Sequence, residues 1–305
     1  MAAPIVVFAY NRREHLKATL EALCSNEGVE QADAFIFVDK AKQGEEDTKN
    51  QEVVEYLEEF RKTAPFAKLT ITYAAEHKGL ANSVIAGVTQ VIDAYGRVIV
   101  LEDDIVTAPA FLAYMNKALE VYEKEQTIWS VSGYTLPLPA LEQYPQDVYK
   151  FYRCCSWGWA TWKDRWDRND WSVGDYSVFR KSLRRRYRFN KGGNDLAFML
   201  DRQMLGRIDS WATRWGYMES RLGMFTIYPA KSLVENKGCD GSGTHFASTS
   251  SRYDTIAQTE KKDYQLVMPE LNREVCRQFH DRYSEPKLKH LVKEMLYCMG
   301  LYQVK

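Results

Sequence analysis

Three consecutive carboxylates, Glu102, Asp103 and Asp104, follow a short apolar run over residues 98–101. The run is rich in β-branched side chains, which predicts a strand buried on both faces of a parallel sheet. Ligands of open α/β sheets bind outside the carboxyl ends of the strands, so dense negative charge stands where a ligand is expected. Adjacent acids repel one another and need a cation or a donor-rich partner. An exposed acidic turn is the alternative, and the position after a buried strand favours the ligand site.

The composition is that of an ordinary globular protein. The chain has 305 residues and is 45% hydrophobic, which suits one large domain or a main domain with an appendage. Lys plus Arg and Asp plus Glu both number 41, and this zero net charge argues against nucleic acid as a partner. The six cysteines lack metal-ligand spacing, and no apolar run is long enough to span a bilayer. With no signal peptide before the first strand, we expect a cytoplasmic protein in a reducing environment.

Strands and helices are expected to alternate along the first half of the chain. Apolar runs predict strands at residues 4–10, 34–38, 68–73, 98–101 and 128–133. Helical spacing follows the first three strands, and Asn11 with Glu14 suggests a capping box for the first helix. This alternation predicts an α/β fold with a mostly parallel central sheet and helices on both faces. Residues 134–262 show few clear strands and are expected to complete the site rather than the sheet, and residues 263–305 turn helical again.

The motifs that usually bind phosphates are missing. The sequence has no GxxxxGK[ST] loop, no GxGxxG after its first strand, no GxSxG elbow and no HExxH. A phosphate is therefore better held by a metal ion on the acidic triplet, because Mg²⁺ and Mn²⁺ prefer carboxylate oxygens. A nucleotide-sugar transferase needs this arrangement to neutralise its diphosphate leaving group. Its acceptor hydroxyl is a weak nucleophile and also needs a carboxylate base.

Four features in this order resemble the GT-A glycosyltransferases. They are the strand and Asn-Arg of residues 4–12, Asp39 after the second strand, residues 77–82 at a helix start, and the acidic motif of residues 101–105. The N-terminal half resembles the family 2-like sugar transferases of bacterial surface polysaccharides. Its Glu-Asp-Asp motif also resembles the N-acetylglucosaminyltransferase I type. The resemblance implies a GT-A fold, a nucleotide-sugar donor and a divalent metal ion, Mn²⁺ or Mg²⁺.

The resemblance implies a role for each matching position. Asp104 would bind the metal ion, Asp103 the ribose or the metal ion, and Glu102 would lie near the base or ribose. Asp39 would hydrogen-bond the nucleotide base, although Lys40 stands where family members often have Gly or Asp. The other donor-site residues would line the base or diphosphate pocket, or reach the diphosphate or sugar: Ala9, Tyr10, Arg12, His77 and Lys78. A solvated Arg12 and a structural His77 are the alternatives.

Two tryptophans in the second half are candidates for the acceptor site. Trp157 and Trp159 lie in a segment that resembles the Gly-Trp acceptor-side loop of such transferases. Their apolar faces and ring N–H groups suit stacking on a sugar. A tryptophan-rich corner of the core is the alternative.

The catalytic base is expected among three acids of the second half, Asp195, Asp209 and Glu219. In N-acetylglucosaminyltransferase I-like enzymes the base lies in a Trp-Asp-Asp-Trp segment shortly before a strand. The resemblance favours Asp209, because it precedes residues 227–229 in a similar way. The match is loose, since Ile and Ser replace the Trp and Asp on either side of it.

Two further segments suggest ligand contacts. Residues 236–245 form a glycine-rich polar loop that would close over a bound nucleotide, with His245 near the diphosphate or metal ion. An ordinary mobile loop is the alternative. Residues 180–191 are strongly basic, which fits an anionic membrane, a lipid-diphosphate acceptor or a solvated helix face. The basic, amphipathic residues 287–302 fit peripheral membrane docking or packing onto the sheet.

These observations predict an inverting, metal-dependent glycosyltransferase that moves a hexosyl or N-acetylhexosaminyl group. The donor would be a nucleotide-diphosphate sugar, with UDP expected, and the acceptor a glycan or lipid-linked glycan of surface polysaccharide synthesis. Residues 1–133 would form the nucleotide-sugar-binding half of the domain, residues 134–262 its acceptor-side half, and residues 263–305 a helical extension. A sugar nucleotidyltransferase and a non-catalytic carbohydrate-binding protein are the alternatives. The enzyme would be cytoplasmic, with contact to the inner face of the plasma membrane.

Overall fold

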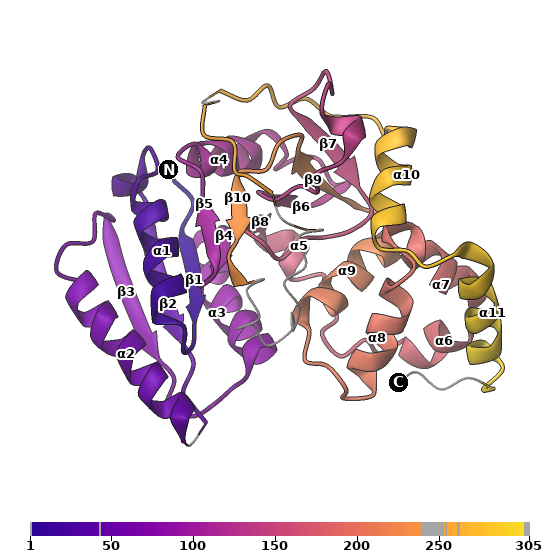
Figure 1. Cartoon of the computed structure of the whole chain (residues 1–305), viewed down its shortest axis with the longest axis horizontal. Helices are drawn as coiled ribbons and strands as arrows, with labels where there is room; N and C mark the ends of the chain where they lie inside the picture. The colour runs from indigo at the N-terminus through magenta and orange to yellow at the C-terminus, as the bar shows by residue number, and fades with distance from the viewer. Residues whose placement is uncertain (1, 43, 239–252, 254, 261–262, 302–305) are drawn as a thin grey trace.

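A mixed sheet of eight strands forms the centre of the molecule (Figure 1). The computed structural model describes the chain except for residues 1, 43, 239–252, 254, 261–262 and 302–305. In spatial order the strands are β3 (Lys68–Tyr73), β2 (Asp33–Val38), β1 (Ile5–Ala9), β4 (Arg97–Glu102), β8 (Trp159–Trp162), β6 (Ile128–Ser132), β9 (Phe225–Pro229) and β7 (Val148–Phe151). Strands β8 and β7 run opposite to the other six. A separate ribbon pairs β5 (Ile105–Thr107) with β10 (Val234–Asn236).

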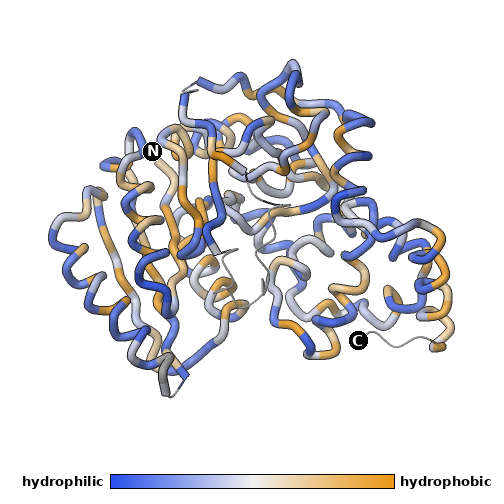
Figure 2. The backbone as a smooth tube through the Cα atoms, viewed as in Figure 1, coloured by the Kyte–Doolittle hydropathy of each residue, from blue (hydrophilic) through white to orange (hydrophobic). Residues whose placement is uncertain are grey.

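Helices cover both faces of this sheet, as predicted. Successive side chains of a strand point to opposite faces, and β1 shows this directly. Its Val7 belongs to the core cluster that includes residues of α1 (Arg13–Cys24), α2 (Glu45–Phe60) and α4 (Phe111–Val121), whereas Val6 belongs to the cluster that includes residues of α3 (Leu80–Tyr95). All five β1 residues are buried, and Figure 2 shows hydrophobic residues along the central strands. The predicted α/β class with a mostly parallel sheet is therefore confirmed.

The expectation that residues 134–262 add little to the sheet is wrong. They supply β7, β8 and β9 of the sheet, and β8 lies between two parallel strands at the centre. Strands β7 and β8 have four residues each, and all four of β8 are buried, so neither offers enough alternation to be recognised. Two antiparallel ladders, to β4 and β6, hold β8 in place.

Short helices build a lobe beside the sheet. The lobe contains α6 (Tyr176–Lys181), α7 (Leu183–Phe189), α8 (Leu196–Met204), α9 (Trp211–Leu222) and α11 (Lys287–Cys298). The remaining elements are α5 (Lys163–Trp166), α10 (Arg273–Arg282) and three turns of 3₁₀ helix, η1 (Val29–Gln31), η2 (Pro139–Leu141) and η3 (Asn190–Gly192). Among the described residues no helix is both long and apolar enough to cross a membrane.

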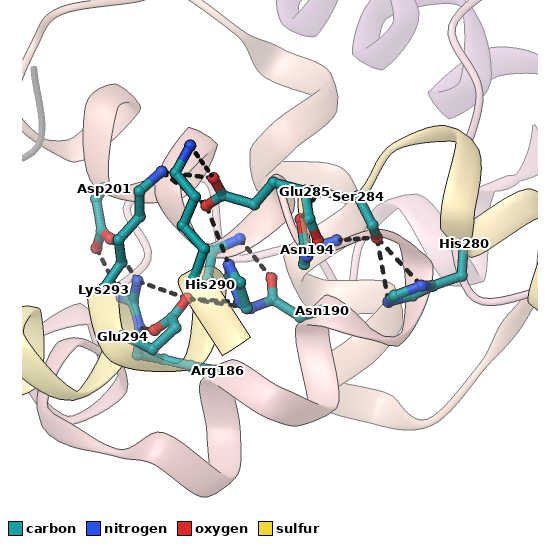
Figure 3. Close-up of polar contacts among 12 residues, drawn as sticks. Arg186, Asn190, Asn194, Asp201, His280, Ser284, Glu285, His290, Lys293 and Glu294 are labelled. Atoms are coloured by element: carbon teal, nitrogen blue, oxygen red, sulfur yellow. Dashed lines mark hydrogen bonds and ion pairs between the residues drawn. The ribbon is translucent and has the colours of Figure 1, made fainter. Parts of the chain in front are cut away.

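A buried network of charged residues joins α11 to α7 and α8 within this lobe (Figure 3). Arg186 of α7 is 1% exposed and donates two hydrogen bonds to Asp201 of α8, at 3.1 and 2.8 Å. It also pairs with Glu294 of α11, which accepts a further bond from Asn190 at 3.1 Å. The ring of Tyr297 lies 4.6 Å from the guanidinium carbon. Arg186 is thus a structural residue, although it belongs to the basic stretch interpreted as a ligand-binding or solvated surface.

A second buried carboxyl group lies where α9 meets β9. Glu219 is fully buried, and Oε1 accepts a hydrogen bond of 2.7 Å from Thr226 Oγ1. The Thr226 hydroxyl also meets Ser130 Oγ at 2.7 Å. Burial raises the pKa of Glu219 to about 8. Glu219 therefore belongs to the core, which removes it from the three candidates for the catalytic base.

We expect Arg186→Gln to lower the free energy of unfolding by about 3–5 kcal/mol, because the change leaves two buried carboxylates without their cation. Arg185→Gln is the matched control, because Arg185 is exposed and pairs with Asp175 at the surface. The control should cost less than about 1 kcal/mol. Urea denaturation of the full chain measures both. Equal urea midpoints of unfolding for the two variants would contradict the structural role of Arg186.

The pH dependence of stability should reveal the titration of the buried Glu219 carboxyl group. Its pKa of about 8 in the folded state exceeds the ordinary 4.5, so between these values the folded state holds more of the proton than the unfolded state. Stability therefore falls as pH rises through this window, by up to about 1.4 kcal/mol per unit. Glu219→Gln removes the titration, so its stability relative to the wild type should increase from pH 5 to pH 8. Parallel stability curves for the two proteins would exclude this effect.

Candidate active site

The site is built around the segment that follows β1. Strand β1 lies between β2 and β4, so its carboxyl end faces two neighbouring strand ends. Tyr10 turns toward the β2 side, where Asn50 Nδ2 donates to its carbonyl at 2.5 Å. Arg12 turns toward the β4 side and pairs with Asp103 and Asp104. The segment thus connects the acidic triplet with a group of residues beside the end of β2, which we call the β2 group: Tyr10, Asp39, Asn50, His77 and Lys78.

The two aspartates of the acidic triplet are buried and paired with one arginine, whereas Glu102 is partly exposed. Asp103 and Asp104 are 4% and 8% exposed. Arg12 Nη2 donates to Asp103 Oδ1 and, at 2.8 Å, to Asp104 Oδ2. The expected capping box is wrong, because Arg12 occupies the N-cap of α1 and makes no side-chain cap bond. Instead its side chain crosses to the carboxylates, so the structure favours a role in the site over a solvated Arg12.

Burial changes the charge state of two carboxyl groups. Burial raises the pKa of Glu102 to about 8, and the charges of Asp104 and Asp103 act in the same direction. Burial also raises the pKa of Asp103 to about 6, against the opposing effect of Arg12. For Arg12 burial alone would lower the pKa, but the two aspartates outweigh it and raise the pKa above its usual value. A single guanidinium therefore does not compensate the whole triplet.

Asp104 presents an acceptor that is free to bind a cation. Its Oδ1 is buried and makes no hydrogen bond within the described part of the chain. On the other side, Asp104 O accepts a hydrogen bond of 2.8 Å from Lys237 N, and a Cβ on Gly238 would collide with the carboxylate. The β5–β10 ribbon brings these residues there, since Asn236 pairs with Ile105. No local pattern in the sequence indicates this contact, because it joins segments far apart in the chain.

The residues present fit a divalent cation, because a buried, unpartnered carboxylate oxygen is the kind of ligand that Mg²⁺ and Mn²⁺ prefer. Within the described ranges no three His, Cys, Asp or Glu side chains gather as a preformed metal site. A site that uses one or two carboxylates together with substrate phosphates does not need such a group. His245, the other predicted ligand, lies outside the described residues.

Asp39 organises the β2 side of the site. Its backbone N–H donates to Ala9 O at 3.0 Å. Its Oδ1 accepts from the backbone N–H groups of Lys40 and Lys78 at 3.0 and 2.9 Å, and Oδ2 accepts from Gly79 N at 2.9 Å. These bonds fix the segment before α3. Each carboxylate oxygen can accept two hydrogen bonds, so the hydrogen bond from Asp39 to a nucleotide base stays a prediction.

His77 lies between Tyr10 and the end of β2. Its Nδ1 is 2.7 Å from Lys40 O and 3.3 Å from Asp39 Oδ2, and its ring centroid is 5.6 Å from that of Tyr10. The side chain is still 30% exposed, so it can meet a ligand. The exposed Lys78 follows it directly. Asn50, a polar residue on the apolar face of α2, supports this group through Asp39 O at 2.9 Å, and that break in the helix pattern could have identified it.

Asp209 lies beside the start of α3, through a contact with the first turn of that helix. Its Oδ2 accepts a hydrogen bond from Ala81 N at 3.3 Å. A Cβ on Gly79 would lie 3.2 Å from the same oxygen, so Asp209 is next to the segment that Asp39 fixes. The residue is exposed and immediately precedes Ser210, the N-cap of α9. Asp195, the remaining candidate, is bound by Arg153 at 2.8 and 2.9 Å.

The two predicted acceptor tryptophans have different positions. Because β8 runs antiparallel to β4 and pairs Trp159 with Val100, the segment before β8 lies at the same sheet edge as the acidic triplet. Trp157 is partly exposed there, with its ring centroid 4.5 Å from that of Tyr134. Trp159 is 1% exposed and stacks on Trp211 with centroids 4.9 Å apart. The core interpretation therefore holds for Trp159, and Trp157 stays a candidate.

Similarity to solved structures is weak. The structure of S. aureus TarS covers 52% of this chain, with 12% identity and a TM-score of 0.34, and the match spans 28% of TarS itself. The mannosyltransferase PcManGT from Pyrobaculum calidifontis, solved in complex with GDP-Man and Mn²⁺, covers 73% of this chain and 74% of its own length. Its identity is 12% and its TM-score 0.41. Similarities at this level support no inference about donor, metal ion or acceptor.

The sequence comparison is more informative. No curated protein matches the chain. The model of the GNT-I family matches residues 1–168, which include β1 to β4, the acidic triplet and the strand β8 beside it. The match supports the resemblance to the N-acetylglucosaminyltransferase I type and leaves the resemblance to bacterial family 2-like enzymes untested. Because the matched segment spans more than half of the chain, the protein belongs to the GNT-I family of glycosyltransferases.

Proposed function

We propose that this protein is an inverting, metal-dependent glycosyltransferase with a nucleotide-diphosphate sugar, UDP-linked, as donor. The observation that carries the proposal is the buried acceptor Asp104 Oδ1, without a partner among the described residues, at the carboxyl end of β4. In a member of the GNT-I family this is the place where a donor diphosphate is expected. The transferred group is a hexosyl or N-acetylhexosaminyl unit.

Asp104 would hold the divalent cation, Mn²⁺ or Mg²⁺, with Asp103 as a second ligand or as a contact to the ribose. Bound there, the cation would act as a Lewis acid that neutralises charge on the departing diphosphate. Arg12 already sits on both carboxylates, within reach of any anion that approaches them. Its fixed positive charge suits binding of a diphosphate oxygen. Glu102 completes the pocket near the base or ribose.

The β2 group would hold the rest of the donor. Tyr10 and His77 present adjacent rings, and His77 and Lys78 are available to the diphosphate or sugar. Ala9 lines the pocket from the end of β1. Asp39 would act through the backbone that it fixes, by holding His77 and Lys78 in place. Such positioning reduces the entropy lost when the donor is bound.

The acceptor side would be formed by Trp157 and Asp209. Trp157 offers a partly exposed ring at the sheet edge of the acidic triplet, suited to stacking on a sugar. In a single displacement, the acceptor oxygen bonds to the anomeric carbon while the bond to the diphosphate breaks. Asp209 takes the proton of the attacking hydroxyl, and its exposure leaves it free to do so. One displacement at the anomeric carbon inverts its configuration.

Two other functions are less well supported. A sugar nucleotidyltransferase would need a glycine-rich, basic loop after its first strand, and residues 9–12 read Ala-Tyr-Asn-Arg instead. A non-catalytic carbohydrate-binding protein would have no need for a triplet of acids, two of them buried, that calls for a cation. Release of pyrophosphate from a nucleoside triphosphate and a sugar phosphate would identify the first. Calorimetric binding of glycan without nucleotide or metal ion would identify the second.

The proposed setting is the synthesis of surface polysaccharide at the cytoplasmic face of the plasma membrane. The acceptor would be a glycan or lipid-linked glycan, and nucleic acid is not expected as a partner because the net charge is zero. A peripheral enzyme would reach a lipid-linked acceptor without a membrane span.

Asp104→Asn should abolish Mn²⁺-dependent binding of UDP and UDP-sugars, because the amide keeps the shape of the side chain but loses its charge. Calorimetric titration with and without Mn²⁺ measures this, and a thermal-shift screen of nucleotide sugars identifies the donor. Asp281→Asn, at an exposed position of α10, is the matched control and should bind normally. Unchanged metal-dependent binding by the Asp104 variant would refute the site.

Asp209→Asn should leave donor binding intact and lower kcat about 10²–10⁴-fold, the usual contribution of a general base. Radiolabelled sugar transfer, measured at saturating donor and acceptor, gives kcat. Donor titration of the same variant separates this result from the loss expected for Asp104→Asn. If transfer by the Asp209 variant stays within a few-fold of the wild type, another residue is the base.

A further inference from the structure

The helical lobe carries an apolar stripe that no described element covers. Five side chains along α11 and its C-cap are between 45% and 76% exposed. They are Leu288, Leu291, Val292, Met295 and Met299. Their spacing of three and four residues places them on one side of the helix. Figures 1 and 2 show α11 at the outer edge of the molecule, with hydrophobic and hydrophilic residues along it.

The stripe differs from the face that holds α11 to the lobe. That face carries Glu294 and Tyr297, which are 4% and 3% exposed and contact Arg186. Packing within the chain therefore uses one side of α11 and leaves the apolar side open. A surface helix normally turns its apolar stripe toward the core. An exposed stripe of this kind indicates an external apolar partner.

The adjacent helix α7, which packs against α11, provides positive charge. Residues 176–191 contain seven Lys or Arg and no Asp or Glu. A surface hollow of about 550 Å³ is lined by Ser182, Arg184, Arg185, Tyr187, Arg188 and Lys191. Arg184 and Arg188 are exposed and have no ion pair in the described part of the chain. Tyr187 between them is 73% exposed, and tyrosine suits a membrane–water interface.

Charge decides between the partners that an apolar stripe would accept. A second copy of the chain would bring its own basic helix toward this one, and like charges in an interface are unfavourable. An anionic bilayer offers hydrocarbon for the stripe and phosphate groups for the arginines. On α11 the only acidic residue is Glu294, and it is buried against Arg186. No exposed acid of α7 or α11 therefore opposes an anionic surface.

We propose that α11 and α7 form a docking surface for an anionic lipid bilayer. The α11 stripe enters the headgroup region of the bilayer, and Arg184 and Arg188 of α7 bind lipid phosphates beside it. The surface is separate from the site of sugar transfer, and lipid binding does not depend on that activity. For the transferase proposed above, such docking would bring the enzyme to a lipid-linked acceptor.

Flotation of the full-length protein with vesicles tests the proposal. Vesicles of phosphatidylcholine containing phosphatidylglycerol should bind the protein, and vesicles of phosphatidylcholine alone should bind it much less. High salt should weaken the binding, because it screens exposed charges. Asp104→Asn should float like the wild type, so failure of the transferase proposal can be distinguished from failure of this one. Absence of binding to the anionic vesicles would overturn the proposal.

Paired variants identify the surface. Leu291→Glu with Met295→Glu should reduce binding to the level seen with phosphatidylcholine alone. Arg184→Ala with Arg188→Ala should weaken binding roughly 30-fold, from the loss of two charges near the membrane. Val267→Glu with Met268→Glu is the apolar control, at 43% and 42% exposure, and Arg202→Ala with Lys231→Ala is the basic control. Thermal melts check that each variant is folded.

Both controls should bind vesicles like the wild type. Equal binding by the surface variants and the controls would overturn the proposal. Light scattering distinguishes the competing partner. A dimer that the Leu291 and Met295 changes dissociate, with vesicle binding unchanged, would assign the stripe to self-association and overturn lipid docking.

Discussion

Three carboxyl groups at the end of one buried strand cannot all be ionised without positive charge close by. The chain supplies a single guanidinium, Arg12, and burial raises the pKa of Glu102 and Asp103 despite it. Arg12, three residues after the end of β1, and Gly238, two residues after the end of β10, approach the two aspartates of the triplet. A bound cation, or a substrate that brings a positive counter-ion, would compensate the remaining negative charge of the triplet.

The geometry around this charge depends on strands from the second half of the chain. Antiparallel β8 brings its amino end, with Trp157 just before it, to the edge where β4 ends. The β5–β10 ribbon brings Gly238 onto Asp104. Parallel strands alone would need long crossovers to bring these segments there. Mixing strand directions therefore lets distant segments share one edge of the sheet.

Local pattern in the sequence was enough to predict the first half of the fold. The strands β1 to β4 and β6 are apolar runs bounded by helices, so their places and the mostly parallel sheet follow from periodicity. The strands β7 and β8 were missed because four residues, nearly all of them buried, are too few to show an informative period. The rest of the sheet depends on contacts such as Trp159 with Val100, which are far apart in sequence.

In the candidate site, too, some features follow from local sequence and others depend on contacts between distant segments. The position of Asp103 and Asp104 followed from a strand and the acids after it. Their pairing with Arg12 did not, because helix-start arginines are usually solvated. The different burial of Trp157 and Trp159 also could not be predicted from the sequence, because it depends on where the short strand β8 begins, at Trp159. Side-chain direction in a short strand is set by its neighbours and not by its own composition.

The buried tryptophans also contribute to the proposed chemistry. Trp159 stacks on Trp211, only two residues after Asp209, and Trp215 lies fully buried one turn further along α9. At the other end of the helix, Glu219 is hydrogen-bonded inside the core. These contacts fix α9 against the sheet, and the Asp209 bond to Ala81 N ties its start to α3. An exposed carboxylate can act as a base only if its place relative to the acceptor is constant. Trp159 would therefore serve the reaction as a positioning residue, through the helix that presents Asp209.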